Sequence, residues 1–180
     1  MVGMKINYSF GKCAHSAKKP ILPVRVGNVT IYAGAVEYFY GRKLYNEYDV
    51  LVPLERGISP FDSVVPNIKF GTICLWAAMS EDRTPSGWQR FLSEKLVFYL
   101  ENRKRVLAYC YNGHGQTGML IGSLISTFES KIMTPDPIAE TRLRYCPHAI
   151  QTLLQAETVF AVRGEALPDK YVEEFVKKSA

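Results

Sequence analysis

Residues 106–118 read Val106-Leu-Ala-Tyr-Cys-Tyr-Asn-Gly-His-Gly-Gln-Thr-Gly118 and place Cys110 where an apolar run meets a glycine-rich loop. The apolar residues 119–128 that follow predict a helix behind the loop. The first free N–H groups of such a helix, and its dipole, point back at the cysteine. They stabilise a thiolate there and can also hold an oxyanion in front of the sulfur. The stretch therefore predicts an anion-binding site built around a nucleophilic cysteine.

The loop itself contains three glycines in six residues. Glycines can merely form a tight turn, but this density leaves backbone amides uncovered by side chains, as an anion-binding loop requires. We therefore expect a bound anion to lie against the backbone and side chains of the whole loop. Its residues are Tyr111, Asn112, Gly113, His114, Gly115, Gln116 and Thr117.

This loop resembles that of the cysteine-dependent phosphatases of the protein-tyrosine and dual-specificity superfamily, which reads His-Cys-x-x-Gly-x-x-Arg-Ser/Thr-Gly. Cys110, Gly113, Thr117 and Gly118 match the pattern. Gly115 also matches the members that read Gly-x-Gly at this point. The resemblance implies phosphoryl transfer through a Cys110 thiolate.

Two positions of the loop depart from the family pattern. Tyr109 stands where the family has its histidine, and Gln116 stands where it has its arginine. A glutamine amide offers neither the permanent charge nor the planar two-donor fork of a guanidinium. His114 lies where some phosphoinositide phosphatases carry a loop lysine, so it is either a source of part of the missing charge when protonated or an ordinary loop residue.

Two further segments resemble the same family. Residues 80–86 resemble the mobile loop that carries the general-acid aspartate, and this assigns Asp82 as the acid, with Glu81 as the alternative. Residues 142–155 resemble the closing segment Ala/Leu-Ile-Gln-Thr-x-x-Gln. In the classical tyrosine phosphatases the first glutamine of that segment orients the hydrolytic water, and the resemblance gives this role to Gln151.

Apolar periodicity along the chain alternates between strands and helices. Strands are expected at residues 24–33 (with a turn at 27–28), 48–54, 68–76 and 105–110. Helices are expected at residues 34–46, 86–103 (with Ser86 as N-cap), 117–131, 136–145, 149–163 and 168–178. This order predicts one α/β domain over residues 1–180, with a central, mostly parallel sheet flanked by helices. Ligands bind such sheets beyond the carboxyl ends of the strands, where Cys110 falls.

Composition narrows the possible partners and surroundings. A net charge of +5 favours a phosphorylated or otherwise anionic substrate, but no aromatic-interleaved basic stripe indicates nucleic acid. No apolar run is long enough to span a membrane and no signal peptide is recognisable, so a soluble, cytoplasmic protein is expected. The four cysteines are widely spaced without a Cys-x-x-Cys pair, so we expect no metal site, disulfide framework or cofactor.

Two classes of function are consistent with these residues, and the choice between them depends on Gln116. The first is a cysteine-based phosphatase-like hydrolase in which Cys110 attacks phosphorus, Asp82 protonates the leaving oxygen and Gln151 positions water. Its activity would be weakened or altered because Gln116 replaces the arginine. The alternative is a pseudophosphatase that binds a phosphorylated ligand or a protein partner without catalysis. Cys110 and the candidate acid and water-positioning residues favour the enzyme, whereas Gln116 favours the binding protein.

Overall fold

The computed structural model describes residues 13–39, 47–55, 58, 71–77, 79 and 86–179. Its sheet contains β1 (Ile21–Val26), β2 (Val29–Ala35), β3 (Val50–Pro53), β4 (Ile73–Cys74) and β5 (Val106–Cys110). The strands lie side by side in the order β1-β2-β5-β3-β4. Only β1 runs antiparallel to its neighbour, and β2, β5, β3 and β4 are parallel to one another. The predicted mostly parallel α/β sheet is confirmed.

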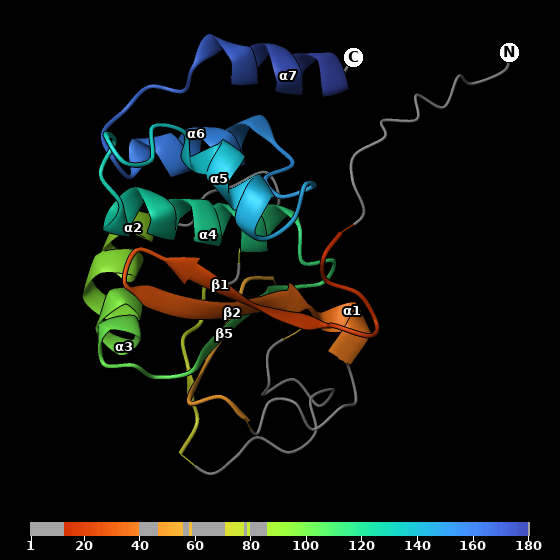
Figure 1. Cartoon of the computed structure of the whole chain (residues 1–180), viewed down its shortest axis with the longest axis vertical. Helices are drawn as coiled ribbons and strands as arrows, with labels where there is room; N and C mark the ends of the chain where they lie inside the picture. The colour runs from red at the N-terminus through yellow and green to blue at the C-terminus, as the bar shows by residue number, and fades with distance from the viewer. Residues whose placement is uncertain are drawn as a thin grey trace, which may run out of the picture.

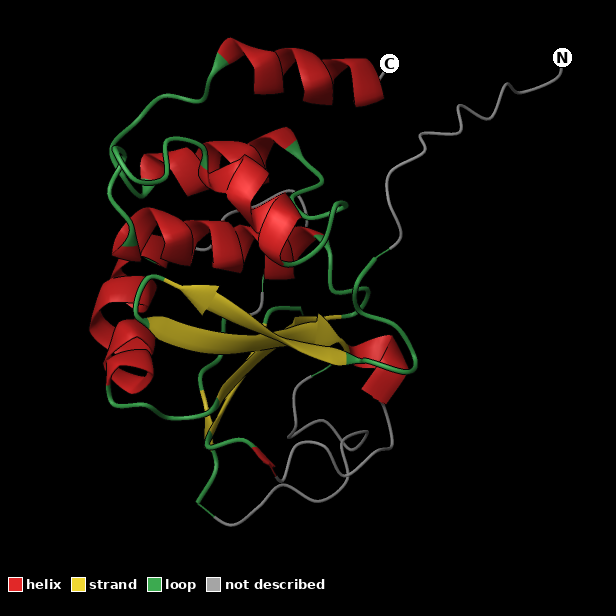
Figure 2. Ribbon diagram, viewed as in Figure 1, coloured by secondary structure: helices red, strands yellow, loops and turns green. Residues whose placement is uncertain are grey.

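The helices cover chiefly one face of this sheet (Figure 1). They are α1 (Val36–Phe39), α2 (Trp88–Phe91), the π-helical η2 (Leu92–Leu96), α3 (Val97–Glu101), α4 (Gly115–Phe128), α5 (Pro137–Arg144), α6 (Leu153–Ala161) and α7 (Asp169–Ser179). Figure 2 shows α4 next to the sheet, α5 and α6 beyond it, and α7 outermost. None of the helices in the described part of the chain is long and apolar enough to cross a membrane.

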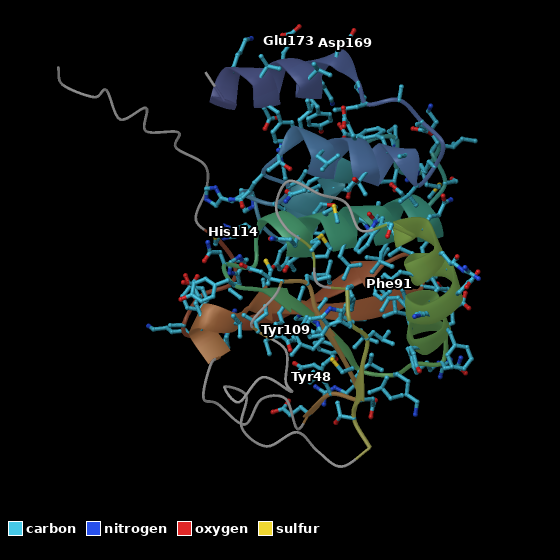
Figure 3. The ribbon with its side chains drawn as sticks, turned by 180° about the vertical axis from the view of Figure 1, so that it is seen from behind. Tyr48, Phe91, Tyr109, His114, Asp169 and Glu173 are labelled. Atoms are coloured by element: carbon cyan, nitrogen blue, oxygen red, sulfur yellow. The ribbon has the colours of Figure 1, made fainter. Side chains whose placement is uncertain are left out.

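Strand β5 passes through the centre of the core. Alternate side chains of a strand point to opposite faces. Ala108 and Cys110 therefore join the large apolar cluster under α4, whereas Leu107 and Tyr109 join a smaller cluster on the other face. Figure 3 shows Tyr48, another member of that smaller cluster, and Tyr109 on the side of the sheet away from α4.

The predicted β1–β2 hairpin is confirmed, with its turn at residues 27–28. Gly27 adopts a left-handed φ of 53°, which glycine takes without steric cost. The Gly27 N–H donates to Glu129 Oε1 at 2.8 Å, which fastens the hairpin turn to the residue that ends α4.

Two local predictions were wrong in detail. The N-cap of α2 is Gly87, at a φ of 77° and without a side-chain cap, rather than Ser86. This helix is held instead by packing, since Trp88 is buried and its Nε1–H donates to Ser123 Oγ of α4 at 3.0 Å. Of the strand expected at residues 68–76, residues 68–70 lie outside the described part of the chain, and within 71–76 only residues 73–74 form β4, although Leu75 N–H still donates to Leu51 O at 2.8 Å.

Candidate functional site

Cys110 ends the central strand and begins the loop that leads into α4. Its neighbours β2 and β3 are both parallel to β5, so the sulfur lies at the carboxyl edge of three adjacent strands. The residue is 1% exposed. The Thr117 hydroxyl, in the first turn of α4, donates to Cys110 Sγ at 3.1 Å. The structure therefore brings together the predicted nucleophile and the predicted helix N-terminus.

The surroundings of Cys110 act on its pKa in opposite directions. Burial raises the pKa of the thiol, and hydrogen bonds from the Thr117 hydroxyl and from the amides of Thr117 and Gly113 lower it. The negative charge of Glu55 raises it further, and the net pKa is above the ordinary value. These surroundings, without a bound anion, therefore favour the thiol over the thiolate.

Two loop glycines are required by close backbone contacts. Gly113 has a φ of +70°, and a Cβ there would lie 3.0 Å from Ala35 at the end of β2. A Cβ on Gly118 would lie 2.7 Å from Ile150 N and 2.8 Å from Ala149 Cβ. Such distances are shorter than normal contacts, so both glycines let the loop pack directly on neighbouring segments.

Replacing Gly118 tests this packing, with Gly122 of the same helix as a matched control. Both glycine-to-alanine changes gain roughly 1 kcal/mol of helix propensity. At Gly122 a Cβ meets side-chain atoms of Val159 and Thr141 at 2.9 to 3.1 Å, whereas at Gly118 it meets backbone. We expect Gly118→Ala to lower the free energy of unfolding by about 1–3 kcal/mol, and Gly122→Ala to lower it less. Urea denaturation of both variants measures this difference, and equal effects would contradict the close packing at Gly118.

Gln151 lies beside the loop, as its predicted role requires. A Cβ on Gly115 would be 3.2 Å from Gln151 Oε1 and 2.9 Å from Gln155 Nε2. The Gln151 N–H donates to Gln155 Oε1 at 2.8 Å, and Gln155 completes a capping box with Thr152 at the start of α6. Gly115 therefore leaves room for two glutamine amides at the edge of the predicted anion-binding loop, residues 111–117.

Glu55 is a site residue that the sequence analysis missed. The Tyr111 N–H donates to Glu55 Oε2 at 2.9 Å, so a carboxylate accepts the hydrogen bond of one of the loop amides. Glu55 comes two residues after β3, which is parallel to β5 and adjacent to it. Because carboxyl ends of parallel neighbours meet at one edge, an acidic residue at this position was the available signal.

Of the remaining predicted residues, those of the loop itself are described. Gln116 is 4% exposed in the first turn of α4, so its side chain is held inside the protein. Tyr111 is 53% exposed and Asn112 is also exposed, whereas His114 is half-buried at the N-cap of α4. Asp82 and Glu81 lie outside the described residues.

A cluster of two cysteines and two histidines adjoins the loop. One ligand atom from each of Cys13, His15, His114 and Cys146 lies within 4.8 Å of all the others. Burial, followed by the charges of His114 and His148, lowers the pKa of His15 to about 4, so its imidazole is neutral at pH 7. The sequence analysis expected no metal site because the four cysteines are widely spaced without a Cys-x-x-Cys pair. The available signal was the short Cys13-x-His15 spacing.

Comparison with known proteins relates this architecture to one group of enzymes. No protein-family model matches the chain, and a search of curated proteins also finds no match. Solved structures do match. Kinase-associated phosphatase with its catalytic cysteine replaced by serine has a TM-score of 0.63 and 17% identity, covering 85% of this chain and 97% of that chain.

Two further structures agree with this match. The active form of Tk-PTP has a TM-score of 0.59 and 16% identity, covering 78% of this chain and 95% of that one. Human DUSP28 has a TM-score of 0.57 and 12% identity, covering 80% of this chain and 93% of that one. The chain therefore has the fold of the tyrosine and dual-specificity phosphatases.

Proposed function

We propose that this chain, which has the fold of the tyrosine and dual-specificity phosphatases, is a cysteine-based hydrolase of a phosphate ester or related anionic substrate. One observation carries the proposal: the Thr117 hydroxyl, in the first turn of α4, donates to Cys110 Sγ at 3.1 Å, so the sulfur lies against the N-terminus of that helix. A buried structural cysteine has no need of this placement, whereas a thiolate nucleophile and leaving group does.

Each residue then has a defined part in the reaction. The Cys110 thiol gives its proton to an oxygen of the bound phosphate, Sγ attacks phosphorus and the ester P–O bond breaks, giving a thiophosphate on the enzyme. Asp82 gives a proton to the leaving oxygen. Water oriented by the Gln151 amide then attacks phosphorus and gives a proton back to the Asp82 carboxylate, and the P–S bond breaks to release phosphate and the Cys110 thiolate. The Thr117 hydroxyl stabilises that thiolate by donating to it.

Gln116 makes this hydrolase slow on ordinary phosphomonoesters. An arginine at this position would place a charged two-donor fork on oxygens that gain negative charge in the transition state. Losing such a group costs about 3–5 kcal/mol, on the order of a hundred- to several-thousand-fold in rate. A substrate with less negative charge would be affected less, because a neutral amide can still donate one hydrogen bond.

The net charge of the chain and the Cys110 thiol indicate the class of substrate and the cellular compartment. The positive net charge of +5 attracts a phosphorylated protein or small molecule. A nucleophilic Cys110 needs a reducing compartment to remain a free thiol, which is consistent with the cytoplasm.

Cysteine-dependent turnover tests the proposal. We expect wild-type protein to hydrolyse a generic aryl phosphate slowly, and Cys110→Ser to abolish that rate because an alkoxide is far harder to form than a thiolate. A wild-type rate no higher than that of Cys110→Ser would exclude the hydrolase.

A second candidate, a binding protein without catalysis, is favoured by Glu55. Its carboxylate occupies the Tyr111 amide that a phosphate would otherwise use. With Gln116 in place of the arginine, the loop then stabilises a phosphoryl group less well in the transition state, which weakens catalysis. Absence of cysteine-dependent turnover, with a phosphorylated ligand or a protein partner still bound, would make this the better assignment.

Removing the Glu55 carboxylate should strengthen anion binding in either case. We expect Glu55→Gln to lower the inhibition or dissociation constant of inorganic phosphate at least about fivefold, because a repelling charge is lost and a neutral amide oxygen holds the Tyr111 N–H less strongly than a carboxylate does. Glu47→Gln is the matched control, since it removes the same charge from an exposed side chain paired with Arg105 at 3.5 Å. Isothermal titration of both variants measures the difference, and equal changes would assign the effect to net charge alone.

A further inference from the structure

We propose that Cys13, His15, His114 and Cys146 form a structural Zn²⁺ site that joins the N-terminal segment to the anion-binding loop. The four ligand atoms lie within 4.8 Å of one another. Cys13 Sγ lies 3.3 Å from His114 Nε2 and 3.3 Å from Cys146 Sγ. Figure 3 shows His114 beside the beginning of α4, at the same level as that helix.

His15 supplies the second, independent observation. The residue is 1% exposed, and neither ring nitrogen has a hydrogen-bond partner among the described residues. Burying unpaired polar atoms costs free energy, so nearly all buried polar groups in proteins have a partner. The His15 ring stacks on Tyr145 at 5.4 Å between centroids and lies 4.9 Å from the His114 ring. A metal ion in the cluster provides the missing partner for one nitrogen.

The spacing of the cluster fits a tetrahedral ion after a small contraction. Zinc binds sulfur at about 2.3 Å and imidazole nitrogen at about 2.0–2.1 Å, so its ligands lie roughly 3.3–3.8 Å apart. Both 3.3 Å contacts of Cys13 are close to this spacing. The more distant ligands, within 4.8 Å, need to approach by about 1 Å.

The four donor atoms favour Zn²⁺ as the metal and argue against a Cys13–Cys146 disulfide in its place. Two thiolates and two imidazoles in a tetrahedral arrangement are typical of Zn²⁺. A Cys13–Cys146 disulfide would need the sulfurs to move from 3.3 Å to about 2.05 Å. It would also leave the buried His15 imidazole without a partner.

The site is structural, because four protein ligands leave no open coordination position. Two thiolates balance the charge of Zn²⁺, so the ion does not replace the positive charge that Gln116 lacks. Its effect is mechanical: it fixes residues 13–15 and the Cys146 segment against His114, at the N-cap of α4. The loop also gains support from the adjacent Tyr145, whose hydroxyl donates to Gly113 O at 2.6 Å.

Metal analysis of the whole chain, purified without chelators, tests the proposal. We expect about one zinc per chain by mass spectrometry, and at least about hundredfold weaker zinc binding in Cys146→Ser and His15→Ala, since each loses a direct ligand. Cys74→Ser and His148→Ala are the matched controls. Cys74 lies on β4, and the His148 ring lies 5.5 Å from that of His114 outside the ligand set, so both variants should keep the metal.

Cobalt substitution of the wild-type chain covers the case in which the ligand variants fail to fold. Co²⁺ in this site should show the strong visible bands of a tetrahedral ion together with thiolate-to-metal charge transfer. Zinc-free protein with four titratable thiols, a Cys13–Cys146 disulfide, or zinc that survives Cys146→Ser would each overturn the proposal. None of these readouts depends on phosphatase activity, so the metal site and the proposed function can fail separately.

Discussion

Replacing Gln116 with arginine is expected to raise turnover of a generic aryl phosphate by at least about tenfold, equivalent to roughly 1.4 kcal/mol of transition-state stabilisation. The new guanidinium would supply the bidentate, charged contact to the phosphoryl oxygens. Gln116 is 4% exposed at the start of α4, so an arginine there is confined near the loop rather than free in solvent. Steady-state kinetics on the purified variant measures the change.

Two further variants test the cause of the increased turnover. Gln116→Lys adds the charge without the planar fork, so it should recover less than the arginine. Cys110→Ser in the Gln116→Arg background should abolish turnover, because the reaction still depends on the thiolate. An arginine variant that unfolds like wild type but shows no gain would mean that the loop is not arranged for phosphoryl transfer. The binding protein would then be the better assignment.

Glu129→Gln is expected to lower the free energy of unfolding at pH 7 by on the order of 2 kcal/mol. A bidentate ion pair holds this carboxylate, with Arg144 Nη1 at 2.5 Å and Nη2 at 3.0 Å. The Thr134 hydroxyl and the Gly27 amide also donate to it. The hydrogen bonds from Arg144 are the main reason that the pKa of Glu129 falls from 4.5 to about 2.

The effect has a defined pH dependence. The pKa of Glu129 is lower in the folded protein, so its stabilising contribution is complete above about pH 4.5 and is lost as the pH falls toward about 2. Urea denaturation between pH 7 and pH 2.5 should therefore show wild type and Glu129→Gln converging in acid. Glu173→Gln, which removes an exposed carboxylate paired with Lys177 at 3.5 Å, should stay near wild type throughout. If the free energies of unfolding of wild type and Glu129→Gln instead differed by the same amount at every pH, the carboxylate charge would not be the source of the stabilisation.

Local sequence signals predicted the elements that local interactions determine. The β1–β2 hairpin follows from strand residues around Gly27, and the strand ending at Cys110 follows from its apolar run. The helix predicted at residues 117–131 also follows from an apolar run and is found as α4, at residues 115–128. The start of α2 was misplaced because the buried Trp88, rather than a side-chain cap, holds that end.

The candidate site likewise contains residues that local sequence predicts and residues that it does not. Cys110 and the glycine loop are contiguous in sequence, so their proximity could be predicted. Gln151 was predicted from the resemblance of its segment to the phosphatase family. The contact of Glu55 with the Tyr111 amide and the cluster around His15 depend on chain segments far apart in sequence. No local pattern encodes which of these segments meet. Asp82 as the general acid stays a prediction.

The position of β5 ties the centre of the sheet to a late part of the chain. Both neighbours of this strand, β2 and β3, precede it in sequence, so during synthesis their inner edges stay unpaired until residues 106–110 are available. Unpaired strand edges favour aggregation, and long-range parallel pairing is slow to form. Because Cys110 ends β5, pairing of this strand also brings residues 111–117 to the carboxyl edge of β2 and β3. A partly folded chain therefore has neither a reactive cysteine in place nor a protected sheet, and an anion that binds the loop should also limit aggregation.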